Sequence, residues 1–140
     1  MRFVCYAFVD DTDLFQAADT PETEWTVVKD KMQEQIDHWE GGLRATGGAL
    51  REDKSFWYLI DYEWKKGKWV YKTIDDTPGD ITVRVDKGHR EVIQRLEPQE
   101  ARETVGVWLA MDGNNIKQAE VHKEKTLAFD DGTQVLSRLT

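Results

Sequence analysis

The chain has 140 residues, of which 39% are hydrophobic and 33% charged, so it is long enough for one domain with a buried core and is not intrinsically disordered. Its single cysteine, Cys5, excludes an intrachain disulfide and a zinc site built from several thiolates. The net charge of −8 argues against binding to a phosphate backbone, so weak or no nucleic-acid binding is expected of this chain alone. A metal-dependent phosphate site stays open, because its cations would supply the positive charge.

The first predicted element is a β-hairpin. Residues 3–9 form an apolar run without alternation, which predicts a strand buried on both faces. Residues 9–12 would make the turn, and residues 14–16 would return as the second strand. The run is too short for a signal peptide or a membrane span, so we expect an intracellular protein, cytoplasmic or nuclear, with no membrane partner.

Two carboxylates, Asp10 and Asp11, would occupy the tip of this hairpin. Carboxylate oxygens suit Mg²⁺ or Mn²⁺, which favours Asp10 as a direct ligand and Asp11 as a peripheral one. The spacing alone also fits an ordinary acidic turn, because aspartate is common in turns. Asp13 is expected to be solvated, and the three histidines are too scattered along the sequence to form a zinc site.

A long amphipathic helix follows. Thr20 suits the N-cap and Pro21 the first helical position, and Gly47 and Gly48 would end the helix. Between them apolar residues recur at steps of three and four, which predicts a face packed on the core. These residues are Trp25, Val28, Met32, Ile36, Trp39 and Leu43.

Hairpin patterns fill the middle of the chain. Residues 55–64 read as one strand, and residues 69–72 return after a lysine-rich turn. A second hairpin joins residues 81–85 to residues 91–96 through a turn at residues 86–88. The lysines and flanking tryptophans of the first turn permit stacking on a nucleic-acid strand, but we favour a solvated turn with tryptophans in the core.

Near the C-terminus, residues 105–110 are a candidate buried strand, residues 112–115 a turn and cap, and residues 116–128 a short helix. Hairpin, long helix, strands and short helix together predict an α+β fold, in one domain over residues 1–140.

Several of these segments resemble the palm domain of reverse transcriptases. Residues 6–14, YAFVDDTDL, look like the aspartate-pair motif, in which an aromatic residue, a variable residue and two aspartates sit at a hairpin tip. Residues 46–50, TGGAL, and then Lys54 are similar to the glycine-containing turn and lysine of the next palm motif. Residues 103–109 resemble the strand that leads into the primer grip and thumb, with Val105 and Gly106 at the primer-grip-like position.

The resemblance implies a partial polymerase palm with a catalytic-type hairpin, a long amphipathic helix, lineage-specific hairpins over about residues 61–100, and a short C-terminal helix. The intact enzyme would be a nucleotidyltransferase of retrotransposon type, an RNA-directed DNA polymerase that uses Mg²⁺ or Mn²⁺. Its partners would be an RNA or DNA template-primer and deoxynucleotides. Asp10 and Asp11 would hold metal, and Lys54 would lie near the pyrophosphate.

In that family the strand with the first metal-binding aspartate, the nucleotide-selecting segment and the fingers come well before the aspartate pair. Residues 1–7 cannot contain them, so we expect a fragment that is inactive alone and is able to associate with the missing polymerase segments. Two alternatives stay open. One is a non-enzymatic β-rich interaction domain whose acidic tip is incidental, and the other is a polymerase half that pairs with another chain.

Overall fold

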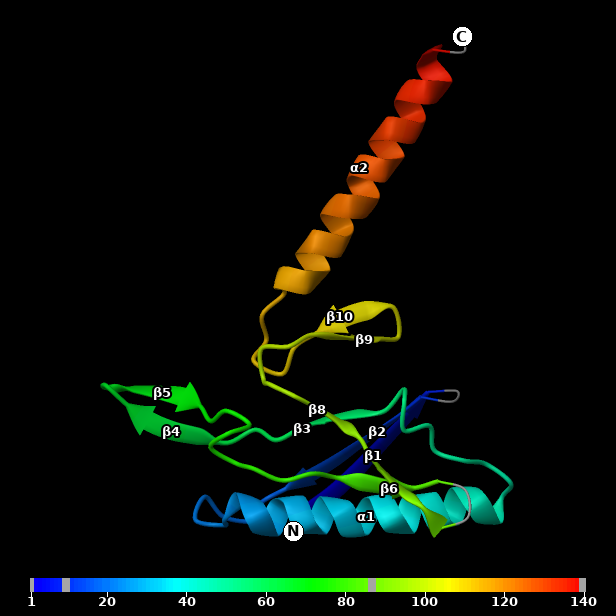
Figure 1. Cartoon of the computed structure of the whole chain (residues 1–140). Coiled ribbons are helices and arrows are strands. Elements are labelled where there is room, and N and C mark those ends of the chain that lie inside the picture. Colours follow the sequence, from blue (N-terminus) through cyan, green and yellow to red (C-terminus); the bar gives the residue numbers. More distant parts are fainter. Residues whose placement is uncertain (1, 9–10, 86–87, 139–140) are drawn as a thin grey trace. The chain divides into compact units, whose positions relative to one another are not determined.

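The structure, a computed structural model, describes residues 2–8, 11–85 and 88–138. It confirms an α+β fold of two helices and several two-stranded sheets (Figure 1). The chain divides into two compact units, which we call unit 1 (Met1–Glu97) and unit 2 (Pro98–Thr140).

Unit 1 contains β1 (Arg2–Phe8), β2 (Asp11–Ala17), α1 (Trp25–Ala45), β3 (Phe56–Tyr58), β4 (Tyr62–Lys65), β5 (Lys68–Tyr71), β6 (Thr82–Arg84), β7 (Arg90–Val92) and β8 (Gln94–Leu96). Unit 2 contains β9 (Arg102–Thr104), β10 (Val107–Leu109) and α2 (Ile116–Arg138). Four sheets are antiparallel hairpins, and β3 pairs with β8 in parallel.

The predicted N-terminal hairpin is confirmed as β1–β2, with Phe8 opposite Asp11 in the register. Its predicted burial on both faces is wrong for the described side chains, because Val4, Cys5 and Ala7 are exposed. The physical reason is that a two-stranded sheet has little to cover it. Leu14 of β2 packs against the core, whereas the alternate positions of β2 face solvent.

The helix α1 begins later than predicted. Thr20 and Pro21 lie in a turn in which the Thr23 N–H donates to the Thr20 carbonyl at 3.2 Å, and the helix starts at Trp25 with Glu24 as N-cap residue. The predicted end is confirmed. Gly47 has a φ of +83°, and the Gly48 N–H donates to the Leu43 carbonyl at 2.8 Å, which is the hydrogen bond of a Schellman cap.

The core of unit 1 lies between α1 and the strands that follow it. Its buried members come from α1, β3, β6 and the segments beside β6 and β7, and they are Ile36, Trp57, Ile81, Val83 and Ile93. Leu14, Met32, Leu50 and Leu59 pack against them. The predicted apolar stripe of α1 is therefore confirmed at its centre, whereas Trp25, Trp39 and Leu43 are only half-buried.

A polar stripe on the same helix fastens the edge strand β6. The Gln33 side chain accepts from the Thr82 N–H at 2.9 Å and donates to the Thr82 carbonyl at 2.8 Å, as a neighbouring strand would. Two turns further on, the buried Glu40 carboxylate accepts from Arg44 Nε at 2.8 Å and from the Arg84 N–H at 3.3 Å. These bonds satisfy backbone groups of an edge strand that would otherwise need another strand or water.

The single strand predicted over residues 55–64 is wrong, because the segment splits into β3 and β4. Residues 56–58 pair with β8, from a distant part of the sequence, whereas residues 62–65 pair locally with β5. At the break, Asp61 accepts from the Tyr62 N–H at 2.8 Å and pairs with Lys72 at 2.6 Å. A local pattern of alternation cannot show that its two halves have different partners.

The other two predicted hairpins form at β4–β5 and at β6–β7. The second return strand, predicted over residues 91–96, is wrong at its end, because residues 94–96 form β8 and pair with β3. Asp86 and Lys87, assigned to the second turn, lie outside the described residues. In unit 2 the predicted buried strand over residues 105–110 is wrong at its start and in its burial, since Val107 and Leu109 of β10 are exposed. Val105 and Gly106 form the turn of the β9–β10 hairpin, with φ of +50° and +80°, and Val105 is exposed.

Candidate functional site

The acidic end of the β1–β2 hairpin is the first candidate site. Asp11 begins β2 and is exposed, while Asp10 lies outside the described residues. Exposure alternates along β2, so that Asp11 and Asp13 lie on one open face, and Leu14 is on the opposite, core-facing side. Asp13 is exposed, so the prediction that it is solvated is confirmed. Residues two apart in a strand are about 7 Å apart, so its charge also adds to the negative potential around Asp11.

The acidic face of β2 offers few side chains that can coordinate a metal ion. Within the described ranges, no three His, Cys, Asp or Glu side chains lie together as a group that holds a metal ion. Mg²⁺ commonly binds through one or two carboxylates and keeps several waters. Asp11 fits the role of one such carboxylate. Asp10 lies outside the described residues.

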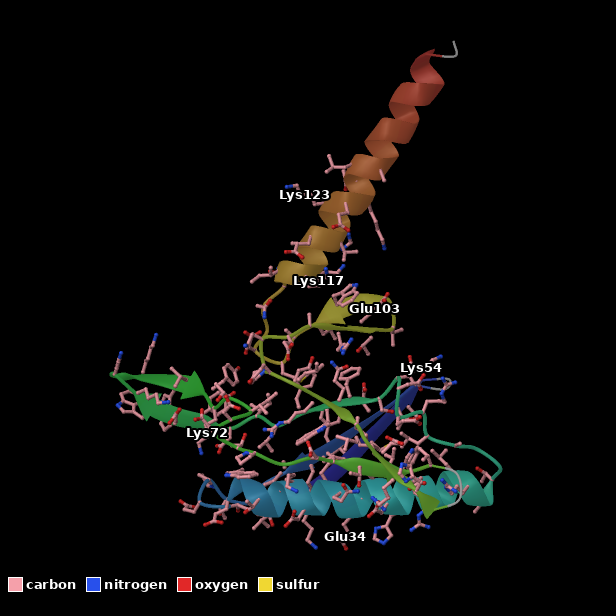
Figure 2. All side chains as sticks on the ribbon, viewed as in Figure 1. Glu34, Lys54, Lys72, Glu103, Lys117 and Lys123 are labelled. Carbon is pink, nitrogen blue, oxygen red and sulfur yellow. The ribbon has the colours of Figure 1, made fainter. Side chains whose placement is uncertain are left out.

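Lys54, the predicted pyrophosphate-side lysine, lies in the loop between α1 and β3 (Figure 2). A tight turn exposes it, since the Lys54 N–H donates to the Arg51 carbonyl at 3.3 Å and the Ser55 hydroxyl donates to that carbonyl at 2.6 Å. The Arg51 guanidinium also donates two hydrogen bonds, of 2.9 and 2.7 Å, to the Asp53 carboxylate. These bonds hold the pKa of the Asp53 carboxyl below its usual range. Among the interactions of described residues, no hydrogen bond or ion pair links Lys54 to Asp11, and Val105 and Gly106 belong to unit 2.

The β4–β5 hairpin is a second candidate site, because its tryptophans are exposed. The expectation that they lie in the core is wrong: Trp64 is 60% and Trp69 is 67% exposed. The register places Trp64 opposite Trp69 and Tyr62 opposite Tyr71, with ring centroids 5.3 and 4.7 Å apart. Directly paired residues share a face, so the hairpin presents four aromatic rings on one side.

A half-buried arginine of β8 braces the loop between β5 and β6. Arg95 lies over the Trp57 ring, 4.7 Å from its centroid, and donates to the Thr77 hydroxyl at 2.6 Å and to the Thr77 carbonyl. Burial lowers the pKa of the Arg95 guanidinium, and the cost of that burial is offset by these bonds. No motif in the sequence singles out Arg95, because its partners lie far from it along the chain.

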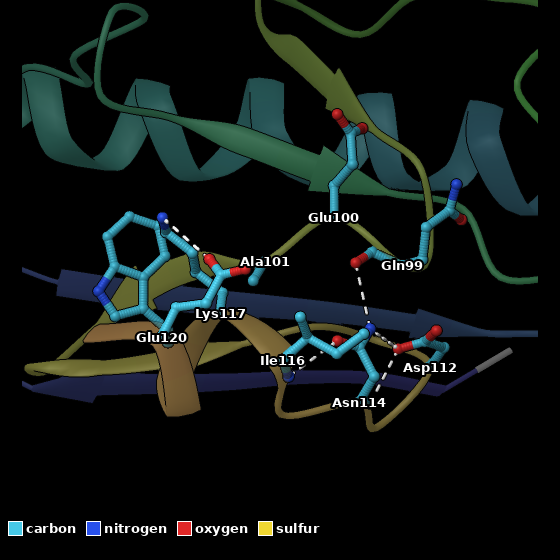
Figure 3. A pocket seen from close by; sticks show the side chains of 9 residues that line it. Gln99, Glu100, Ala101, Asp112, Asn114, Ile116, Lys117 and Glu120 are labelled. Atoms are coloured by element: carbon cyan, nitrogen blue, oxygen red, sulfur yellow. Dashed lines mark hydrogen bonds and ion pairs between the residues drawn. The ribbon is translucent and has the colours of Figure 1, made fainter. Parts of the chain in front are cut away.

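Unit 2 has a hollow of about 470 Å³ beside the start of α2 (Figure 3). On one side, Asn114 bridges the Asp112 carboxylate at 2.5 Å and the Gln99 carbonyl at 3.2 Å. On the other, Lys117 lies 5.5 Å from the Trp108 ring centroid and 3.6 Å from the Glu120 carboxylate. Lys117 and Glu120 pair with each other and Asp112 accepts from Asn114, so these groups have less to offer a ligand.

Comparison with protein-family models, curated proteins and solved structures finds no match for this chain. Neither described helix is both long and apolar enough to cross a bilayer.

Proposed function

We propose that this chain is part of a reverse transcriptase palm of retrotransposon type. The observation that supports this most is the β1–β2 hairpin, whose register sets Asp11 opposite Phe8 and whose core-facing residue Leu14 packs beside the long helix α1. Hairpin and helix follow each other in the order that the resemblance implies. In the intact enzyme, these elements would serve metal-dependent, template-directed DNA synthesis on RNA.

In this proposal Asp10 and Asp11 hold magnesium or manganese at the hairpin tip. The metal would supply activation of the primer hydroxyl and neutralisation of the leaving pyrophosphate. Asp13, on the same face of β2 as Asp11, adds negative potential that attracts the cation. Lys54 would place a positive charge near the pyrophosphate.

The chain alone is proposed to be inactive. Two-metal catalysis uses carboxylates from separate strands, and the resemblance covers one carboxylate-bearing hairpin here. A primer-extension assay with an RNA template, a DNA primer and either Mg²⁺ or Mn²⁺ should yield no product above a no-protein control. Template-dependent extension that disappears in the variant Asp10→Asn/Asp11→Asn would contradict inactivity and would establish the polymerase outright.

Weak metal binding at the tip is tested by titrating the chain with Mn²⁺ and following amide signals by NMR. We expect paramagnetic broadening centred on the backbone of Asp11, which Asp10→Asn/Asp11→Asn abolishes. Asp13→Asn, two residues away on the same face, is the matched control and should retain most of the broadening. Broadening that spreads evenly over acidic residues, or that the control removes equally, would refute a site at the tip.

A β-rich interaction domain is the second candidate, favoured by the exposed rings of Tyr62, Trp64 and Trp69. Sequencing the transcript on the 5′ side of the Met1 codon separates the two proposals. An upstream strand with a single aspartate followed by a nucleotide-selecting segment supports the polymerase. A sequence without them, in any reading frame, supports the interaction domain.

A further inference from the structure

The β4–β5 hairpin is built as a projecting arm with different chemistry on its face and at its tip. It extends from the rest of unit 1 in Figure 1. The aromatic face consists of Tyr62, Trp64, Trp69 and Tyr71, and the tip carries Lys65, Lys66 and Lys68. Nothing in the β4–β5 pairing buries Trp64 or Trp69, which are the two most exposed tryptophans among the described residues.

Ion pairs around the hairpin leave two of its lysines available. Lys65 pairs with Glu63 at 2.5 Å and Lys72 pairs with Asp61 at 2.6 Å, so the carboxylate on β4 and the one just before β4 are both neutralised. A third carboxylate, Asp76, accepts hydrogen bonds from the Thr73 N–H and hydroxyl. Glu63, and to a smaller extent Asp76, raise the pKa of Lys65. Lys66 and Lys68 make no ion pair with any described residue and are exposed.

From this arrangement we infer that the β4–β5 hairpin binds single-stranded nucleic acid, with bases stacked on Trp64 and Trp69 and phosphates beside Lys66 and Lys68. Exposed indoles stack on any base, and adjacent lysines attract the backbone, which is the combination found in sequence-tolerant single-strand binders. The Trp64–Trp69 pair is edge-to-face, with planes 76° apart, so the two rings do not cover each other's faces.

Charge also favours single-stranded nucleic acid over two other binding partners. A second copy of the chain would bring lysine tips of like charge together, and an apolar or proline-rich peptide would gain nothing from Lys66 and Lys68. The net charge of −8 repels nucleic acid from the chain as a whole, so binding is confined to the locally basic tip and is weak at physiological salt. This inference is independent of the proposed function, since residues 61–72 lie outside the segments that carry the resemblance.

The test is fluorescence anisotropy of a labelled oligo-dT or oligo-U with the full chain. Two lysine–phosphate contacts predict a log–log salt slope of about −1.4, so the affinity should fall about sevenfold between about 50 mM and about 200 mM salt. Trp64→Ala/Trp69→Ala should weaken binding at least about tenfold, because each stacked base contributes on the order of 1–3 kcal/mol.

Lys66→Ala/Lys68→Ala leaves the aromatic rings in place and should flatten the salt slope towards zero. Lys123→Ala/Lys125→Ala removes two exposed lysines of α2 and is the charge-matched control, which should leave affinity and slope unchanged. Circular dichroism confirms that each variant is folded. If the control weakens binding as much as Lys66→Ala/Lys68→Ala does, the attraction is diffuse and the hairpin site is refuted.

The indole N–H signals in NMR give the site directly. Oligonucleotide should shift the Trp64 and Trp69 signals and leave that of the core residue Trp57 in place. If they stay in place, or if a proline-rich peptide shifts them and the oligonucleotide does not, the inference is overturned in favour of a protein-binding face. These outcomes do not depend on primer extension or Mn²⁺ binding, so either proposal can fail while the other stands.

Discussion

The two hairpins β1–β2 and β4–β5 show how one element can be stabilised in two ways. In β1–β2, Leu14 packs against the core, and the end nearest Asp11 is acidic. The shorter β4–β5 hairpin is stabilised by its own cross-strand aromatic pairs and ends in lysines. The first therefore depends on the tertiary structure, whereas the second depends on local pairing and exposes Trp64 and Trp69 to solvent.

The largest effect is expected from a cavity in the core. Ile36 is 6% exposed and lies in the cluster that Leu14 joins, so Ile36→Ala should cost about 3 kcal/mol of unfolding free energy. Amide exchange in β2 should accelerate about a hundredfold, since a core-packed strand exchanges through global unfolding. Exchange in β4–β5 should change little, because an exposed hairpin opens locally.

Urea denaturation and hydrogen exchange measure both quantities for Ile36→Ala. Ile60→Ala is the control, since Ile60 is 38% exposed and its loss should cost under about 1 kcal/mol. Equal acceleration of exchange in both hairpins would mean that they unfold as one unit.

The next largest effect concerns the polar stripe of α1. Glu40 is 4% exposed and accepts bonds from Arg44 and from the Arg84 N–H, so Glu40→Ala should cost about 2 kcal/mol. The change removes the acceptor of the Arg44 Nε–H and of the Arg84 backbone N–H, while Arg44 still donates to the Arg84 and Val85 carbonyls. Thermal denaturation measures the loss. Glu34→Ala, at an exposed i,i+3 pair with Lys31, is the control and should leave the melting temperature nearly unchanged.

A smaller effect of opposite sign is expected at the turn of β4–β5. Lys66 has a φ of +50°, which strains a residue with a Cβ, and Gly67 follows at +77°. Lys66→Asn creates the Asn-Gly pair that such two-residue turns prefer and should stabilise the hairpin by about 0.5 kcal/mol. The control Lys68→Asn removes the same charge from a strand position and should not stabilise the hairpin. The rate of amide exchange at Trp64 measures the stability of the hairpin in both variants.

The smallest effect is a pH dependence just after β5. The Thr73 backbone N–H, and then its hydroxyl, lower the pKa of the Asp76 carboxyl in the folded chain. Its stabilising contribution is therefore present above the unfolded value of about 4 and is lost as the pH falls through the lower folded value. Asp76→Asn should lose less stability than the parent chain between about pH 7 and about pH 3, as urea midpoints would reveal. An equal loss in both would assign the acid sensitivity to other carboxylates.

Local signals in the sequence predicted much of this fold correctly. The glycines after Ala45 end α1, the glycine-containing lysine turn joins β4 to β5, and the hydrophobic spacing of α1 identifies Ile36 as core. Each of these features depends on residues within a few positions of one another, so the local sequence is enough to predict it. The acidic pair was visible for the same reason, although its assignment to a palm stays a proposal.

Contacts between distant residues decided the rest. Pairing of β3 with β8 breaks a strand that is continuous by pattern, and Gln33 and Glu40 dock α1 on β6 through polar residues that an apolar stripe does not reveal. The exposure of Trp64 and Trp69 was unpredictable too, since a tryptophan has the same sequence signal in a core and on a projecting hairpin. By itself the sequence determined which elements form and where they turn. Only the tertiary structure decided which faces are covered, because burial depends on neighbours that the chain brings from far away.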